Sequence, residues 1–375
     1  MKKIYYLVFY DLPNSEVKRN YPLSAATKAN YMISVFERAG YNVACISAAI
    51  PCTLKLTFHN RQQKIISNNV SLEFFSAFSG TAFCAKVIKK IWNSCSLMMR
   101  LLKLTRNDTL VVYHSIAYQN IVILAKIIKN FKLVLELNEI YSDVTILSGF
   151  KKVGERKIIS IADTYIFSTH FLNERVNAYG KPYTINHGTY NITIQQKGKR
   201  SGNTINVVYA GTLDPTKGAL AAVAAAAYLP SNYKLHILGF GNKYEIELLE
   251  NLILSINNKG KAQVIFHGTK EGLEFERFLQ CCDIGLSTQN PDSKFNSSSF
   301  PSKILTYMAN GLRVVTIDIP AIKDSKVGPY LSYYSTQTPK ALADAIMESE
   351  SNIYNSQEIL IQLDSELKKE LRNIL

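Results

Sequence analysis

The segment Gly211–Gly218 (GTLDPTKG) combines glycines with a lysine in a way that suits phosphate binding. It follows the apolar run Ile205–Ala210 and precedes an alanine-rich helical pattern. A glycine at a strand end lets the backbone approach a ligand closely, and the N–H groups that open the next helix attract an anion. Lys217 would then neutralise phosphate charge. An ordinary strand-to-helix turn explains the same residues, and both interpretations stay open.

A second segment, Phe300–Gly311 (FPSKILTYMANG), places a lysine at the start of a helix. Pro301 suits the first helical position and Ser299 suits the N-cap, so that Ser302 and Lys303 fall in the first turn. A cation there opposes the helix dipole unless an anion binds at the same end. The pattern therefore favours an anion site over a merely solvated helix start.

Polar residues also follow apolar runs in the first half of the chain. His114 ends the run VVY, and Glu136, Asn138 and Glu139 end the run beginning at Leu133. We predict that these residues line a cleft and that Glu139 is a general base for an acceptor hydroxyl or orients it. His187 lies near the end of the first half and either lines the same cleft or packs structurally.

Short β-branched runs alternate with helical patterns along the whole chain, which predicts parallel sheets with helical crossovers. The fold class is therefore α/β, with two Rossmann-like, doubly wound domains facing a cleft where ligands bind. We place the first domain at 1–195, a linker at 196–204 and the second domain at 205–340. Helices at 341–375 would follow and could pack back on the first domain.

Charge is concentrated in one half of the 375 residues. Residues 1–195 hold 24 Lys and Arg against 11 Asp and Glu, whereas residues 196–375 hold 19 against 18. This asymmetry favours an anionic partner of the first half, although a solubilising surface is the alternative. Cysteine and histidine spacing indicates no metal site, no apolar run is long enough for a membrane span, and no nucleic-acid-binding module is present. We expect a cytoplasmic location.

The segment Thr81–Leu104 has apolar residues at helical spacing, interspersed with five Lys and Arg, and it contains the only tryptophan, Trp92. Such a helix either packs its apolar stripe on the sheet or lies on an anionic membrane. Both possibilities stay open from the sequence.

The two phosphate-type segments, with VIFHGT and FLQCCDIGLS between them, resemble the C-terminal domain of GT-B glycosyltransferases, in particular family 4 enzymes of surface-polysaccharide synthesis. The resemblance covers residues 205–317 well and the first half only in outline. It implies donor-binding residues at Gly211, Thr212, Lys217, Gly268, Thr269, Pro301, Ser302, Lys303 and Thr306. It also implies that His114 lies near the reacting sugar.

The sequence departs from the family pattern at several positions. Thr212 stands where an arginine is usual, and Ser298 and Thr306 stand where the family has two glutamates. The second glutamate normally accepts hydrogen bonds from the donor ribose. Tyr21–Ala25 replaces the glycine-rich loop that precedes the first helix in the family.

The resemblance implies transfer of a hexose-type sugar from a nucleotide diphosphate-sugar, UDP-sugar above all, to a glycan or lipid-linked acceptor. It implies retention of anomeric configuration, no metal or other cofactor, and peripheral contact of residues 81–104 with an anionic membrane. The departures keep two alternatives open: a non-catalytic GT-B subunit that binds glycan or protein, and a nucleotide-sugar 2-epimerase.

Overall fold

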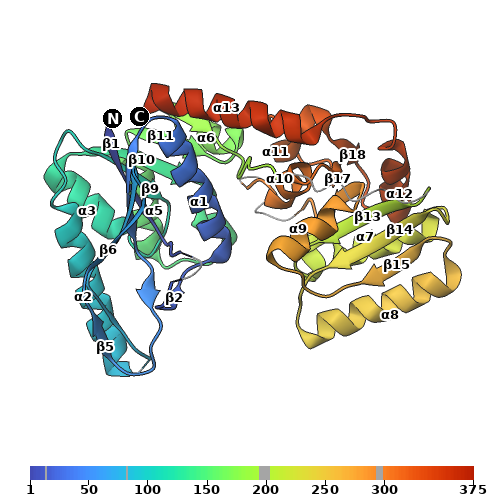
Figure 1. The fold of residues 1–375 in the computed structure, drawn as a ribbon, viewed down its shortest axis with the longest axis horizontal. Helices are drawn as coiled ribbons and strands as arrows, with labels where there is room; N and C mark the ends of the chain where they lie inside the picture. Colours follow the sequence, from blue (N-terminus) through green and yellow to red (C-terminus); the bar gives the residue numbers. More distant parts are fainter. Residues whose placement is uncertain (13–14, 82, 194–202, 293–298) are drawn as a thin grey trace. The chain divides into compact units, whose positions relative to one another are not determined.

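The computed structural model describes residues 1–12, 15–81, 83–193, 203–292 and 299–375, and the chain divides into two units (Figure 1). The first unit holds Met1–Thr189 and Ser365–Leu375, and the second holds Tyr190–Asp364. All but the last two residues of the predicted linker 196–204 lie outside the described residues, so that the linker stays a prediction.

The first unit is built on an eight-stranded sheet with the order β12-β11-β10-β9-β1-β3-β7-β6. Every neighbouring pair is parallel except β6 with β7. The strands are β1 (Lys3–Val8), β3 (Asn42–Ser47), β6 (Gln62–Ser67), β7 (Val70–Phe74), β9 (Thr109–Tyr113), β10 (Lys132–Leu137), β11 (Thr164–Phe167) and β12 (Tyr183–Ile185). Because β3 and β9 lie on opposite sides of β1, the chain reverses its winding direction between β1 and β9. A ligand crevice is expected outside the carboxyl ends of these two strands.

Helices cover both faces of this sheet. α1 (Leu23–Arg38) lies on one face, whereas α2 (Phe83–Leu101) and α3 (Gln119–Lys129) lie on the other (Figure 1). α5 (Gly149–Ile161) packs on α3, and the shorter α4 (Tyr141–Val144) and α6 (His170–Val176) complete the unit. Their inner sides and the apolar strands form a core that includes Leu110, Val122 and Ile158.

Residues 50–79 form short strands that the sequence analysis did not predict. β5 (Thr57–His59) pairs with β8 (Ala77–Ser79), and β2 (Arg19–Asn20) pairs with β4 (Ile50–Pro51). The residues of β6 are exposed or half-buried throughout, which leaves no alternation of apolar and polar residues to detect. Glu73 of β7 joins this region to α2 through ion pairs with Arg61 at 2.8 Å and Arg100 at 2.7 Å.

The second unit has a six-stranded parallel sheet with the order β15-β14-β13-β16-β17-β18. Its strands are β13 (Ile205–Ala210), β14 (Tyr233–Leu238), β15 (Gln263–Phe266), β16 (Ile284–Ser287), β17 (Arg313–Ile317) and β18 (Ser332–Tyr334). The winding direction reverses between β13 and β16. The loops that follow these two strands therefore flank the expected ligand crevice of this unit.

Seven helices accompany the described part of the second unit: α7 (Ala219–Ala225), α8 (Lys243–Lys259), α9 (Gly272–Gln280), α10 (Ser302–Ala309), α11 (Pro320–Lys323), α12 (Pro339–Glu348) and α13 (Ser356–Ile374). Two details correct the sequence analysis. Pro301, not Ser299, occupies the N-cap of α10, and the first of the helices expected at 341–375 already begins at Pro339. α12 stops at Glu348, where the carbonyls of Ser349 and Glu350 bond to the guanidinium of Arg313.

The last residues of α13 belong to the first unit. Lys132 Nζ donates a hydrogen bond of 2.6 Å to the carbonyl of Ile374, and Arg372 Nε donates one of 2.9 Å to the carbonyl of Ala39. These contacts fix the chain end beside the amino end of β10 and the end of α1.

Candidate donor and acceptor sites

The glycine turn after β13 is held by hydrogen bonds from buried side chains. Tyr209 Oη donates to the carbonyls of Thr212 (2.9 Å) and Lys217 (3.1 Å). Thr288 Oγ1, in the loop after β16, donates to the carbonyl of Gly218 at 2.8 Å. The turn is thus fixed between the two strands where the winding direction reverses.

Gly218 is the residue that allows this arrangement. Its φ is +89°, and a Cβ atom there would lie 1.9 Å from the carbonyl oxygen of Thr288. Any other residue would combine left-handed strain with a collision against backbone. The alanine-rich helix that follows, α7, ends at Ala225, and a 3-10 turn covers Ala226–Tyr228.

Lys303 extends from α10 to the start of the glycine turn. Its Nζ lies 4.2 Å from the centroid of the Tyr209 ring, and a Cβ atom on Gly211 would be only 3.1 Å from it. The structure therefore brings Gly211 and Lys303, 92 positions apart in the sequence, to one point.

Electrostatics make this point receptive to an anion. Burial, with the nearby charge of Lys217, lowers the pKa of Lys303 from 10.5 to about 8. Among the described residues, no carboxylate lies within ion-pair distance of Lys303 Nζ. Two lysine charges thus repel each other beside a bare glycine backbone, and a bound anion would relieve that repulsion.

Tyr307 anchors α10 beneath this point. It is fully buried, its Oη accepts a hydrogen bond of 2.8 Å from the backbone N–H of Ala210, and it donates one of 3.2 Å to the carbonyl of Leu286. The ring packs where a Cβ atom on Gly285 would lie, 2.3 Å from its Cγ. Tyr307 therefore positions Lys303, and its role was not predicted from the sequence.

Thr306 and Ser302 are both on α10, but Thr306 turns back on the helix. Its Oγ1 donates to the carbonyl of Ser302 at 3.3 Å, which is the common i−4 bond of a helical threonine. Ser302 is exposed at the helix start. Ser298, the other position that departs from the family pattern, lies outside the described residues.

Gly268 and Thr269 lie at the edge of the same site. The carbonyl of Gly268 accepts a 2.9 Å hydrogen bond from the N–H of Gly239, and the Gly211 N–H donates to the carbonyl of Leu238 at 3.1 Å. The turns after β13, β14 and β15 are thus in contact at the carboxyl edge. Gly239 was missed by the sequence analysis, although the LGFG segment carries it.

In the first unit, the carboxyl ends of the strands hold a pocket of about 480 Å³, which we call the aromatic pocket. It opens beside the winding reversal between β1 and β9, and Glu139 lines it together with Tyr113 and Tyr141. Its lining residues are Phe9, Asn20, Tyr21, Pro22, Ala25, Tyr113, Ser115, Glu139 and Tyr141. Aromatic walls with a few polar groups suit a saccharide, whose ring faces are apolar and whose edges carry hydroxyls.

Glu136 does not line this pocket. Its side chain is fully buried, where the Tyr6 hydroxyl donates to it at 2.7 Å and Lys28 Nζ lies 3.5 Å away. Burial raises the pKa of Glu136 and lowers that of Lys28. Lys28 also donates to Asn138, so that this cluster supports the strand ends from beneath.

His114 is also buried, 2% exposed, and its Nε2 lies 4.0 Å from the Oε1 atom of Glu155. Burial lowers the pKa of His114 to about 4, so the ring is neutral at pH 7. It lies 5.2 Å from the ring of Tyr141, a wall of the aromatic pocket. His187 is buried as well, and its Nδ1 donates a hydrogen bond of 2.7 Å to the carbonyl of Ser168.

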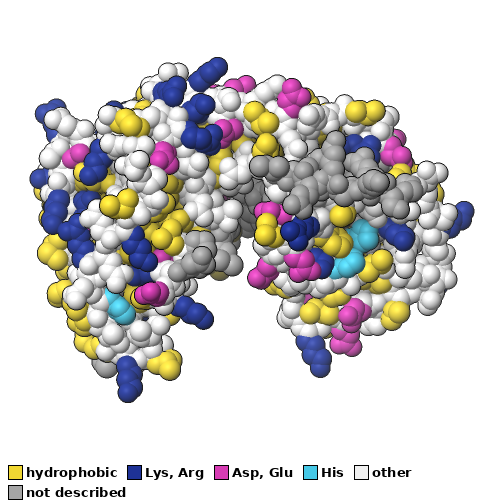
Figure 2. Space-filling view, viewed as in Figure 1, with side chains coloured by type: hydrophobic (Ala, Val, Ile, Leu, Met, Phe, Trp, Pro, Cys, Tyr) yellow, Lys and Arg dark blue, Asp and Glu magenta, His cyan; other side chains and the backbone are white. Residues whose placement is uncertain are grey.

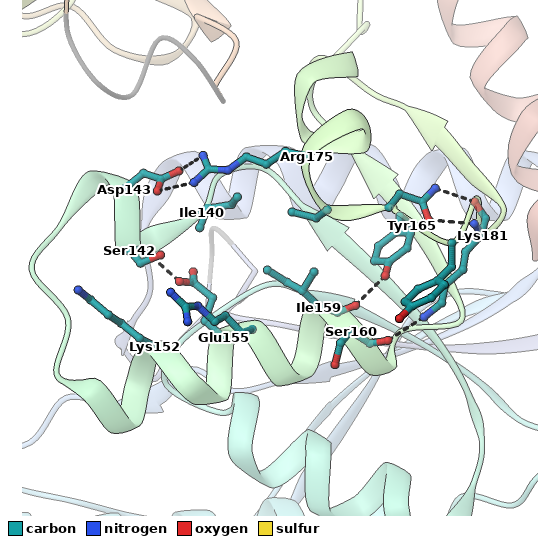
Figure 3. A pocket seen from close by; sticks show the side chains of 14 residues that line it. Ile140, Ser142, Asp143, Lys152, Glu155, Ile159, Ser160, Tyr165, Arg175 and Lys181 are labelled. Carbon is teal, nitrogen blue, oxygen red and sulfur yellow. Dashed lines mark hydrogen bonds and ion pairs between the residues drawn. The ribbon is translucent and has the colours of Figure 1, made fainter.

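A second cavity, of about 460 Å³, lies between α5 and α6 (Figure 3). Arg175 and Asp143 form a two-bonded ion pair at its rim, and Glu155 accepts hydrogen bonds from the N–H groups of Tyr141 (2.7 Å) and Ser142 (3.1 Å). The carboxylate of Glu155 thus fixes the α4 turn. One residue of this turn, Tyr141, lines the aromatic pocket, whereas its neighbours Ile140 and Ser142 line this second cavity.

Within the described ranges, no group of three or more His, Cys, Asp or Glu is arranged to hold a metal ion. No helix searched is both long and apolar enough to cross a bilayer.

Comparison with known proteins supports the architecture and the class of enzyme. Residues 204–352 match the family model described as glycosyl transferases group 1. A search of curated proteins finds no match.

Solved structures match over the whole chain. Sucrose-phosphate synthase from Thermosynechococcus elongatus has 15% identity and a TM-score of 0.67 over 100% of this chain and 99% of its own. HepE from Anabaena in complex with UDP has 14% identity and a TM-score of 0.65 over 100% of both chains. Trehalose 6-phosphate synthase from Burkholderia multivorans has 11% identity and a TM-score of 0.63 over 100% and 95%.

The predicted GT-B fold, with two Rossmann-like units, and the resemblance to group 1 enzymes are thereby confirmed. The chain has the GT-B fold of these neighbours, and its residues 204–352 carry the pattern of glycosyl transferases group 1.

Proposed function

We propose that this glycosyltransferase moves a hexose-type sugar from a UDP-sugar to a saccharide acceptor, without a metal ion and with retention of configuration. The observation that carries the proposal is the cationic point formed by Lys303, Lys217 and the Gly211 backbone. Solved structures of HepE contain UDP, UDP with glucose, and UDP-glucose, which makes a UDP-sugar the natural first donor to test.

The donor diphosphate would lie against Gly211 and Thr212, between Lys217 and Lys303. The start of α10, with Pro301 and exposed Ser302, would offer N–H and hydroxyl donors to phosphate oxygens. Gly268 and Thr269 would contact the nucleotide base. Thr306 bonds to its own helix, so we expect weaker contact with the ribose than a glutamate gives.

In the reaction the bond between the anomeric carbon and the diphosphate oxygen breaks, and the acceptor oxygen bonds to the anomeric carbon on the same face that the diphosphate leaves, so that configuration is retained. The two lysines stabilise the negative charge that develops on the departing diphosphate, the work that a metal ion does in other transferases. Glu139 in the aromatic pocket takes the proton of the acceptor hydroxyl. Neutral His114 positions the Tyr141 wall of that pocket.

The aromatic pocket would hold the sugar that receives the transfer. We propose that the acceptor is a glycan or a lipid-linked saccharide of polysaccharide synthesis, met at the cytoplasmic face of a membrane. Peripheral contact of residues 81–104 with anionic lipid is part of this proposal. The basic first half of the chain supports it.

A diphosphate-release assay with a panel of nucleotide-sugars, in parallel with thermal shift, tests the function. We expect UDP and one UDP-sugar to raise the melting temperature, EDTA to leave transfer unchanged, and Lys303→Met to abolish both binding and release. Conversion of one UDP-sugar into another without an acceptor would instead show an epimerase. The proposal fails if no nucleotide diphosphate stabilises the protein.

A further inference from the structure

Helix α2 packs on its own unit through both polar and apolar side chains, since Leu97 and Leu101 lie in the core beside buried Asn93 and Ser96. Asn93 forms two hydrogen bonds with the backbone of Phe78, accepting from the N–H at 3.0 Å and donating to the carbonyl at 3.2 Å. Ser96 bonds to Ser76 at 3.1 Å. These bonds, with the Arg100–Glu73 ion pair, fix which side of the helix faces the protein.

A second set of apolar residues on α2, away from Leu97 and Leu101, faces solvent. Val87 is 51% exposed, Ile91 61% and Met99 55%, and Ile88 and Trp92 are also exposed. The expectation that such a stripe packs on the sheet is therefore wrong for these residues. A folded chain gains nothing by exposing them, because each would be more stable out of water.

The neighbouring helix continues this surface. α3 packs against α2 and turns Val122 and Ala125 into the core, while its outer side exposes Leu124, Ile127 and Ile128. On the other side of α2, Phe58 of β5 is exposed and packs edge-on against Trp92, with ring centroids 5.5 Å apart. We call this surface the α2–α3 face. It comprises Phe58, Val87, Ile88, Ile91, Trp92, Met99, Leu124, Ile127 and Ile128.

The basic residues around the α2–α3 face indicate which kind of partner can cover it. Neither helix contains an acidic residue, whereas α2 carries four Lys and Arg and α3 carries two. α5, which packs on α3, adds four more cations, and its one acid, Glu155, is buried. Figure 2 shows hydrophobic and basic side chains interspersed over the unit that contains these helices.

A second copy of the chain is a poor occupant, because a symmetric dimer would place this basic face against itself. An occupant must instead be apolar in its interior and negatively charged at its surface. A bilayer with anionic headgroups has both properties: apolar side chains enter the acyl boundary while lysine stems extend to the headgroups.

We propose that the α2–α3 face docks the enzyme in the surface of an anionic bilayer, with both helices parallel to the membrane plane. The inference enlarges the contact proposed above for residues 81–104 by adding α3 and β5. The inference rests on the proposed function in one respect, the purpose of docking, which is to bring the aromatic pocket to lipid-linked acceptors.

The single tryptophan of the chain gives a direct test, since Trp92 belongs to this face. The full-length protein is mixed with vesicles of phosphatidylcholine alone, or of phosphatidylcholine and phosphatidylglycerol in equal parts. We expect Trp92 emission to move to shorter wavelength and the protein to float with the anionic vesicles only, with weaker flotation at high salt. Unchanged emission with no flotation overturns the proposal.

Variants separate docking from donor binding. Ile91→Glu with Ile127→Glu should weaken vesicle affinity by at least about tenfold, whereas Leu254→Glu on α8, 62% exposed in the native protein, should not. UDP-induced thermal shift should be equal in all three proteins. Full vesicle binding by the double variant, or a dimer that the double variant dissociates, contradicts docking on lipid. If UDP does not raise the melting temperature of the unmodified protein, the donor site is contradicted instead.

Discussion

The charge of Lys303 should lower the stability of the free enzyme while it raises the affinity for UDP. The pKa falls from 10.5 to about 8 because the ammonium is buried and lies near Lys217. At about 1.4 kcal/mol per pKa unit, holding the charge in the folded protein costs about 3 kcal/mol. Because the folded pKa lies below the unfolded one, stability should rise with pH between about 8 and 10.5 as the folded state loses this proton.

Replacing Lys303 by methionine keeps the aliphatic stem and removes the charge. At pH 7 we expect Lys303→Met to raise the melting temperature of the unliganded protein by roughly 5–10 °C and to abolish the UDP-induced shift. Lys261→Met, at an exposed position outside the site, should do neither. Lys217→Met should raise the pKa of Lys303, because it removes the neighbouring positive charge.

Proton uptake provides an independent measurement. A bound diphosphate stabilises the charged lysine, so UDP binding should take up about 0.5 proton at pH 8 and about 0.1 at pH 7. Calorimetry in two buffers of different ionisation enthalpy measures this number. Above pH 8, affinity should fall by about tenfold per pH unit. A destabilised Lys303→Met protein, or UDP binding without proton uptake at pH 8, would refute the reasoning.

Three further changes probe other parts of the two units. Gly218→Ala should unfold the glycine turn and abolish UDP binding. Gly40→Ala, at a similar positive φ with open space around it, should cost only about 1–2 kcal/mol of stability. Equal losses of melting temperature in the two variants would contradict a collision between the new Cβ atom and the Thr288 carbonyl. Glu139→Gln should lower kcat by about 10²-fold or more with little change in UDP affinity, and near-normal turnover would remove Glu139 as the base. Glu136→Gln should cost about 3 kcal/mol of stability because its buried lysine partner stays charged. The stabilisation by UDP should stay unchanged. Denaturation with and without UDP measures both quantities.

Local patterns predicted the elements of this fold well. The apolar run Ile205–Ala210 has the same bounds as strand β13, because buried parallel strands are continuous apolar runs. The alternation of strand and helix then predicted doubly wound sheets, and the switch points followed from the strand order. Short strands whose residues are exposed or half-buried, such as β6, have no continuous apolar run and were not predicted.

The donor site was predicted as two separate segments, but their meeting was not. That Lys303 reaches Gly211 depends on Tyr307, whose ring occupies the space left free at Gly285. Such a contact involves residues far apart in the sequence, and no periodicity records it. The same holds for Glu136, which follows an apolar run as Glu139 does, yet is buried with Lys28 and Tyr6 while Glu139 reaches the pocket.

Which side of α2 faces the protein is a feature that hydrophobic periodicity does not predict. A stripe of apolar residues has the same spacing whether it faces a sheet or a lipid surface. The structure decides the matter at β8, whose backbone needs hydrogen-bond partners that Asn93 supplies and an apolar stripe could not. Asn93 and Ser96 therefore face the protein together with Leu97 and Leu101 of the core, and the apolar residues Val87, Ile88, Ile91, Trp92 and Met99 are left exposed. In the docking that we propose, the hydrogen bonds of Asn93 with Phe78 thus leave these apolar residues of α2 available to the membrane.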